Sequence, residues 1–216
     1  MATEPTVPGF TALTFDLARC RTDLDALEQL LASRADLSER EDVLPFFRAH
    51  PDLCLLLSTY NSNMIVPDRI AFELSLFGQF TTDLVIGDWQ RKRYCFVEFE
   101  DATQSSIFVR RARQTSAWST RFLAGHSQVM DWLWLLEAMR DTEPFERQFG
   151  KRSIAMAGLL VIGRDRGVTA ADRLRLEWRR DNMVVGSKHI YCCTFDELAH
   201  DLRQRLDTWP VTPPSG

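Results

Sequence analysis

The chain has 216 residues, of which 45% are hydrophobic and 26% are charged, so it is long enough for one globular domain with a small extension. Its net charge of −4 gives no overall nucleic-acid footprint, so any nucleic-acid binding must use local patches, metal ions or the combined surface of an oligomer. No stretch reaches the roughly 20 apolar residues of a membrane helix, and the N-terminus lacks a basic region followed by an apolar one, so no membrane association is expected.

The cysteines indicate a reducing compartment. Their number is odd and they form no CxxC motif, and Cys95 and Cys192 lie in strand-like sequence. This pattern is typical of reduced structural thiols, and we therefore expect a cytoplasmic protein.

Residues 1–60 are predicted to form a helical N-terminal extension. The first twenty residues contain two prolines and a glycine and are expected to be a loosely held arm. Leucines then recur at helical spacing between residues 24 and 31 and predict a first helix. The capping-box pattern Ser38-Glu-Arg-Glu41 predicts the start of a second helix, which should end at His50 because a residue before proline avoids helical geometry.

Residues 61–208 are predicted to form the main domain. Strands are expected at 83–87, 93–99, 106–110, 154–162 and 188–193, and helices at 116–140, 169–180 and 195–206. Residues 69–77 fit either a helix or a strand, because apolar residues alternate there while Glu73 interrupts them. The pattern predicts an α/β fold in which a mixed central sheet is flanked by helices, followed by a disordered tail over residues 209–216.

Two glutamates in an apolar strand, Glu98 and Glu100, are the strongest functional signal. A period of two places both on the face that carries Tyr94 and Phe96, while the residues between them point to the other face. Two like charges on a buried face repel each other and lose hydration, so a divalent cation is the expected compensation. The alternative is a strand whose glutamates face solvent.

Asp83 supplies a third carboxylate, at the head of a neighbouring predicted strand. From there it can converge with Glu98 in space. Magnesium takes oxygen ligands, typically one or two carboxylates together with water and phosphate. We therefore predict a Mg²⁺ (or Mn²⁺) site whose protein ligands are Asp83 and Glu98.

The order of Asp83, then Glu98-Phe99-Glu100, then Gln128 on a following helix resembles the PD-(D/E)xK nuclease superfamily. The resemblance implies a restriction-endonuclease-like fold, with Asp83 and Glu98 binding the metal and Gln128 supporting the site. Several families of this fold also carry an acid on the helix before the Asp strand, which implies an auxiliary role for Glu73.

Residues from about 45 to 205 are more narrowly similar to the nuclease-like domain of Shedu antiphage defence proteins. The similarity rests on the order and spacing of several segments, which are Phe46–Leu53, Thr82–Ile86, Phe96–Ala102, His126–Trp132, Gly158–Arg164 and Thr194–Leu198. It implies a DNA substrate and a role in antiphage defence.

The chain departs from the superfamily at Glu100, where the motif normally has lysine. A carboxylate cannot supply positive charge to the attacking water, but it can act as a further metal ligand. Arginines cluster downstream, and Arg110, Arg111 and Arg121 are candidates to contact phosphate as bidentate donors. The alternative for this run is a solvated basic edge.

Three functions follow from these observations. The first is a Mg²⁺-dependent DNA endonuclease of the Shedu type, with Asp83, Glu98, Glu100 and Gln128 in its catalytic site. The second is a catalytically eroded nuclease fold that serves as a nucleic-acid or protein binding or sensor module. The third is an assembly protein whose Trp-rich helix, through Trp134, contacts other subunits. In each case we expect a homo-oligomer, either a dimer or a tetramer.

Overall fold

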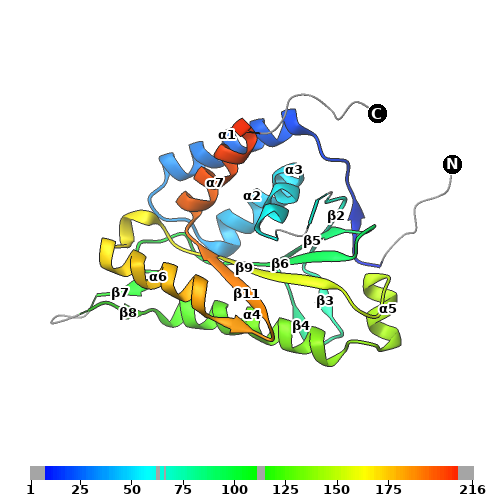
Figure 1. Cartoon of the computed structure of the whole chain (residues 1–216). Helices are drawn as coiled ribbons and strands as arrows, with labels where there is room; N and C mark the ends of the chain where they lie inside the picture. Colours follow the sequence, from blue (N-terminus) through cyan, green and yellow to red (C-terminus); the bar gives the residue numbers. More distant parts are fainter. Residues whose placement is uncertain (1–7, 62–63, 66, 111–114, 209–216) are drawn as a thin grey trace.

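The computed structural model describes residues 8–61, 64–65, 67–110 and 115–208. They form an α/β fold with a mixed sheet between two layers of helices (Figure 1). The strands are, in sheet order, β1 (Thr11–Ala12), β2 (Arg69–Phe72), β5 (Leu84–Asp88), β6 (Arg93–Phe99), β9 (Ala155–Val161), β11 (Lys188–Cys193) and β10 (Val184–Val185). β6, β9 and β11 are mutually parallel neighbours, and the other pairs are antiparallel. The prediction of a mixed sheet flanked by helices is confirmed.

One face of the sheet is covered by N-terminal helices and the last helix (Figure 1). These are α1 (Leu17–Ser33), α2 (Leu44–Ala49), α3 (Pro51–Leu56) and α7 (Phe195–Thr208), with the short helical turns η1 (Glu39–Val43) and η2 (Leu57–Tyr60) between them in sequence. Their apolar side chains share one buried cluster with the sheet residues Cys95, Val97 and Phe99. The N-terminal helices therefore complete the core on this face.

The opposite face is covered by α4 (Thr120–Ala138), α5 (Glu143–Phe149) and α6 (Ala170–Asn182) (Figure 1). Tyr94 and Phe96 belong to the buried cluster on this side, as the period of two predicts. Two small hairpins flank the sheet, β3 (Ser75–Leu76) with β4 (Phe80–Thr81) and β7 (Phe108–Val109) with β8 (Ala117–Trp118), and η3 (Asp165–Gly167) follows β9.

The prediction of a loose arm over the first twenty residues is wrong for residues 8–20. β1 pairs with β2, Phe10 is buried, and α1 begins at Leu17. The Asp16 carboxylate accepts hydrogen bonds from the backbone N–H groups of Ala18 and Arg19 at 2.9 and 3.1 Å, so a good N-cap starts the helix well before the leucine stripe. Residues 1–7, and the predicted tail over 209–216, lie outside the described residues.

Other differences concern boundaries. The long helix begins at Thr120 rather than residue 116, because the Ser119 hydroxyl caps it by accepting from the Phe122 N–H at 2.9 Å. Residues 69–77 are strands β2 and β3 with a turn between them. The predicted strand at 106–110 is limited to β7, which lies outside the main sheet. The predicted helix end at His50 is confirmed, and the helix predicted at 169–180 is α6, which has Thr169 as its N-cap.

All five cysteines are free and buried, in agreement with the prediction of structural thiols. Among the described residues, no helix is both long and apolar enough to cross a membrane.

Candidate active site

Strand pairing brings Asp83 and Glu98 together. β5 and β6 are antiparallel with Leu84 opposite Val97, so the next residues along the ladder are Asp83 and Glu98, on one face of the sheet. The Asp83 Oδ2 accepts a hydrogen bond from the Phe99 backbone N–H at 2.8 Å. The protonated Glu98 carboxyl donates a further hydrogen bond to Asp83. The two acids that the sequence nominates as metal ligands are therefore in direct contact.

The environment of this pair disfavours two negative charges. Glu98 is 5% exposed, and burial, followed by the charges of Asp83 and Glu100, raises its pKa to about 10. Burial also raises the pKa of Asp83 to about 6, against the opposing effect of the Phe99 N–H. At neutral pH the pair therefore holds a proton. The Oε2 atom of Glu98 is buried without a hydrogen-bond partner in the described part of the chain, so one acceptor on this face is unsatisfied.

Glu100 lies just beyond β6, and its side chain contacts an arginine from α4. The Glu100 Oε2 accepts a hydrogen bond from Arg121 Nη1 at 2.7 Å. The same guanidinium lies 3.0 Å from Asp101 Oδ2 and 3.8 Å from Glu39 Oε2. Burial raises the pKa of Glu100, and the hydrogen bond from Arg121 opposes that effect. The guanidinium of Arg121 is thus surrounded by acids at the edge of the site.

Glu39 is a site residue that sequence reasoning missed. Its backbone N–H donates to Asp101 Oδ1 at 2.8 Å, next to an isolated antiparallel bridge between Leu37 and Ala102. Burial, and then the charge of Asp101, raises the pKa of Glu39. The capping-box pattern around Ser38 predicted a helix start here, but no local signal indicated contact with a segment some sixty residues away.

Glu73, the predicted auxiliary acid, is not on a helix. It is exposed in the turn between β2 and β3, with a left-handed φ of 50°. Its carboxylate forms an ion pair with Arg48 Nη2 at 2.8 Å. Residues 69–77, which fit either a helix or a strand, pair as strands, so Glu73 does not lie on a helix before the Asp83 strand. Its charge contributes to the raised pKa of Asp83.

Helix α4 approaches the acidic face closely at a glycine. A Cβ atom on Gly125 would lie 3.0 Å from Leu160 Cδ1 and 3.1 Å from Glu100 Oε1, so a side chain here would press on the site. Gln128 lies almost one turn further along α4 and is half-buried. Its side-chain amide makes no hydrogen bond to any residue that the structure describes. Gln128 therefore lies on the predicted helix, with its polar group uncommitted.

The arginines predicted to contact phosphate do not lie together. Arg121 reaches the acids, whereas Arg110 is exposed beyond the end of β7 and lines a shallow surface pocket with Gln104 and Arg166. Arg111 and Arg113 lie outside the described residues. Of the predicted phosphate-binding candidates, Arg121 is thus the one that the described geometry brings to the acidic face.

His126 faces the core of this layer. It is 3% exposed, and its ring centroid lies 6.0 Å from that of Phe122. Burial, followed by the charge of Arg179, lowers its pKa to about 4. His126 is therefore neutral at physiological pH and has a packing role.

The buried neutral His126 should make stability depend on pH. The pKa of His126 is lower in the folded chain, so the unfolded chain binds more protons between pH 6.5 and 4. The free energy of unfolding therefore decreases as the pH is lowered through that window. We expect wild type to lose roughly 3 kcal/mol relative to His126→Gln between pH 7 and pH 4. Urea unfolding of both proteins at several pH values measures this difference. Parallel pH profiles would contradict the assignment.

The acidic face offers two carboxyl groups to a metal ion. Within the described ranges, no group of three or more His, Cys, Asp or Glu side chains is arranged to hold one. Magnesium, however, requires only one or two protein carboxylates, because water and phosphate complete its octahedron. Asp83 and Glu98 form such a pair, and the unsatisfied Glu98 Oε2 is an oxygen that a cation would satisfy. Glu100 is occupied by Arg121, so the pair alone is the fitting donor set.

Comparison with known proteins gives a family. No curated protein matches the chain in sequence. The model of the family described as "Shedu protein SduA, C-terminal" matches residues 36–199, a range that includes the acidic pair, Glu39 and Arg121. Because this match covers well over half of the 216 residues, the chain belongs to the Shedu SduA C-terminal family.

Proposed function

We propose that this protein is a metal-dependent DNA endonuclease of antiphage defence, with its catalytic site at Asp83 and Glu98. The observation that carries the proposal is the contact between the buried Glu98 carboxyl group and the half-buried Asp83 carboxyl group, with the Glu98 Oε2 unsatisfied. Two acids in contact are costly to bury unless a cation or a proton compensates them. Membership of the Shedu family supports the role in defence, and the mixed sheet is compatible with a PD-(D/E)xK fold.

In this proposal, Asp83 and Glu98 hold a Mg²⁺ or Mn²⁺ ion as carboxylates. A bound ion would supply charge neutralisation for the phosphodiester and acidify a water. The Phe99 N–H orients Asp83 by its 2.8 Å hydrogen bond, which keeps one oxygen of that carboxylate fixed. Gln128 follows Gly125 by three residues on α4, and we assign its uncommitted amide the role of a hydrogen-bond partner for water at the site.

Glu100 receives a different role from that of a third ligand. It stands where the resemblance has lysine, and it holds the guanidinium of Arg121 by a 2.7 Å hydrogen bond. Arginine has five N–H donors, so Arg121 can keep this contact and still donate to a phosphate oxygen. The pair thus brings a guanidinium, rather than a net positive charge, to the edge of the site, and Asp101 and Glu39 contact the same group.

The alternative function is a binding or sensor module on an eroded nuclease fold. The observation that favours it is the surrounding of Arg121 by Glu39, Glu100 and Asp101, because these acids compete with phosphate for the guanidinium. Under this alternative the chain binds nucleic acid or a partner protein without hydrolysis.

Contact between copies of the chain is a further part of the proposal. Trp134 is 60% exposed and Leu123 is 45% exposed on the outer side of α4. Large apolar side chains on one helix face are typical of a subunit interface. A dimer or tetramer assembled through this face would also combine the surfaces that bind DNA.

The proposal is tested by cleavage of plasmid and linear DNA with Mg²⁺ or Mn²⁺. Asp83→Asn and Glu98→Gln should abolish cleavage, because each removes a carboxylate ligand that the ion would need. Arg121→Gln should lower the rate on the order of 100-fold, the usual cost of removing one donor to a developing anion. Asp207→Asn and Glu41→Gln, at exposed positions away from the pair, are matched controls that should cut like wild type.

Two results would count against the endonuclease. If Asp83→Asn and Glu98→Gln cut as fast as wild type, the site is misassigned. If wild type cuts with neither ion but still binds DNA, the eroded-fold alternative holds.

A further inference from the structure

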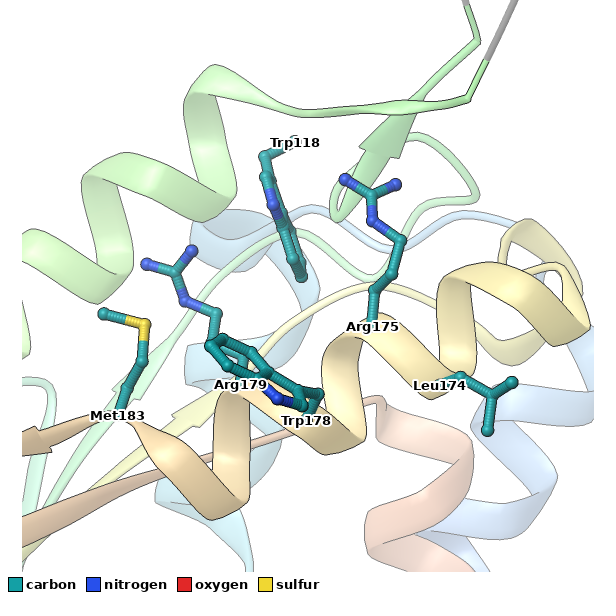
Figure 2. A pocket seen from close by; sticks show the side chains of 6 residues that line it. All are labelled: Trp118, Leu174, Arg175, Trp178, Arg179 and Met183. Atoms are coloured by element: carbon teal, nitrogen blue, oxygen red, sulfur yellow. The ribbon is translucent and has the colours of Figure 1, made fainter.

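A groove lies between β8 and α6, on the outer side of the helical layer (Figure 2). It has a volume of about 320 Å³ and is lined by Trp118, Leu174, Arg175, Trp178, Arg179 and Met183. Its lining is apolar and aromatic apart from two arginines, and it contains no carboxylate. Such a lining suits a ligand that is both flat and negatively charged.

The two arginines differ in how their charges are balanced. Figure 2 shows the Trp118 ring between them, with guanidinium carbons 5.2 Å (Arg175) and 5.1 Å (Arg179) from its centroid. Arg175 is paired with the Asp172 carboxylate at 2.9 Å. Arg179 has no carboxylate partner in the described part of the chain, and its Nε is buried without a hydrogen bond. The groove therefore contains one uncompensated positive charge.

The outer wall of the groove is an exposed aromatic surface. Trp178 is 64% exposed and Leu174 is 67% exposed, one helical turn apart on α6. An indole face presented to solvent is a platform on which another flat ring can stack. The apolar surface is confined to a few side chains, whereas a protein partner typically covers about 800 Å² on each side. The size of the groove thus favours a small flat group.

We propose that this groove binds one unpaired nucleotide of a single-stranded nucleic acid, with its base stacked on Trp178 and its phosphate held by Arg179. A volume of about 320 Å³ lies at the small end of the range for ligand pockets, which is about 300–1,000 Å³. Arginine donates well to phosphate oxygens, and stacking on an aromatic side chain tolerates any base. A base within a duplex cannot stack in this way, because its faces are already covered.

The groove and the acidic site each take one residue from the start of α4. Trp118 lines the groove just before the Ser119 cap, and Arg121, three positions later, contacts Glu100. Binding in the groove does not depend on hydrolysis at Asp83 and Glu98, and the test keeps the two apart.

The test is fluorescence anisotropy of a labelled 12-nucleotide oligo(dT) with the full chain in EDTA. Trp178→Ala should weaken binding roughly 5- to 150-fold, the effect of losing one base–aromatic stack, without changing the salt dependence. Arg179→Gln should reduce the slope of log affinity against log salt by about 0.7, because one phosphate contact is lost. Arg147→Gln, which changes an exposed arginine elsewhere on the surface, should bind like wild type.

Several outcomes would overturn the proposal. Binding of oligo(dT) by Trp178→Ala within twofold of wild type would do so, and the exposed position of Trp178 means that this variant should remain folded. Equal competition by a duplex of the same length would remove the preference for unpaired bases. A loss of subunit association in Trp178→Ala, measured by sedimentation, would assign the groove to contact between copies instead.

Discussion

Glu98→Gln should make the metal-free protein more stable than wild type at pH 8, by on the order of 4 kcal/mol, while the two proteins should be nearly equal at pH 4. The reason is the burial of Glu98, whose pKa is raised from 4.5 to about 10 in the folded chain. Glutamine keeps the shape of the side chain and donates a hydrogen bond to Asp83 as the protonated acid does, but it has no charge to bury.

The direction of the pH effect follows from proton binding. Between pH 4.5 and 10 the folded wild type keeps the Glu98 proton while the unfolded chain releases it, so stability falls as pH rises. Asp83, with its pKa raised from 3.8 to about 6, adds a loss of the same sign at lower pH. The stabilisation from a protonated Glu98 is fully present below pH 4.5 and is lost as pH rises.

Urea unfolding in EDTA from pH 4 to pH 9 measures this effect, with Glu41→Gln as the control for the loss of an exposed glutamate. A stability difference between wild type and Glu98→Gln that stays constant with pH would show that Glu98 is not a buried carboxyl group. A second series with Mg²⁺ addresses the proposed ligand role. At pH 8 the ion should stabilise wild type more than Glu98→Gln, because a ligand that binds the folded state alone shifts the unfolding equilibrium.

At Glu98, the carboxyl group that the proposed activity needs is also one that lowers the stability of the fold. A carboxyl group that costs several kcal/mol to bury is retained where a neutral isostere would fold better. Such a conflict between local stability and sequence is characteristic of functional sites. Glu100 differs, since Arg121 offsets its charge within the folded chain.

The elements that could be predicted from the sequence are those formed by a pattern of neighbouring residues. β6 was predicted at 93–99 and is observed at those residues, because a run of aromatic and apolar residues needs no distant information to form a buried strand. The same reasoning located β9 and β11, and the alternation along β6 placed Glu98 on the face of Tyr94 and Phe96. The antiparallel partner of that strand then brought Asp83 opposite Glu98.

The parts that sequence reasoning missed depend on long-range contacts or on caps that were overlooked. Trp118 fits the apolar stripe of the long helix, but the Ser119 cap leaves it outside, where it pairs in β8 and lines the groove. α5 was not predicted, although Thr142 caps its start and Gly150, with a φ of 73°, ends it. Glu39 lies near the acids because long-range contacts hold residues 31–39 against the sheet. The spacing of residues in the sequence does not predict such contacts.

Arg164→Ala should reduce the free energy of unfolding by about 3–5 kcal/mol, the usual cost of removing one partner from a buried ion pair. Arg164 lies just beyond β9, in a glycine- and arginine-rich segment that is not a phosphate loop, and it is 7% exposed. Its guanidinium donates to the Asp196 carboxylate at 2.9 Å and to the carbonyls of Leu31 and Arg34 at 2.8 and 2.9 Å. One side chain thus satisfies the C-terminal end of α1 and ties it to the start of α7.

The loss of Arg164 leaves the carbonyl groups of Leu31 and Arg34 without this donor, while Asp196 keeps the hydrogen bond from the Asp165 N–H. Arg164→Lys keeps the charge but cannot form the fork of N–H donors, so its effect should be intermediate. Arg147→Ala is the control, since Arg147 is exposed, pairs with Glu143 on α5, and a surface ion pair is worth about 0–1 kcal/mol. Urea unfolding measures all three. A cost for Arg164→Ala no larger than that for Arg147→Ala would show that α1 is held by apolar packing alone. Arg164 also anchors the segment from Leu31 to Ala35, which leads to Leu37 and Glu39. If this anchoring matters, Arg164→Ala should cleave DNA more slowly than the loss of folded protein alone explains.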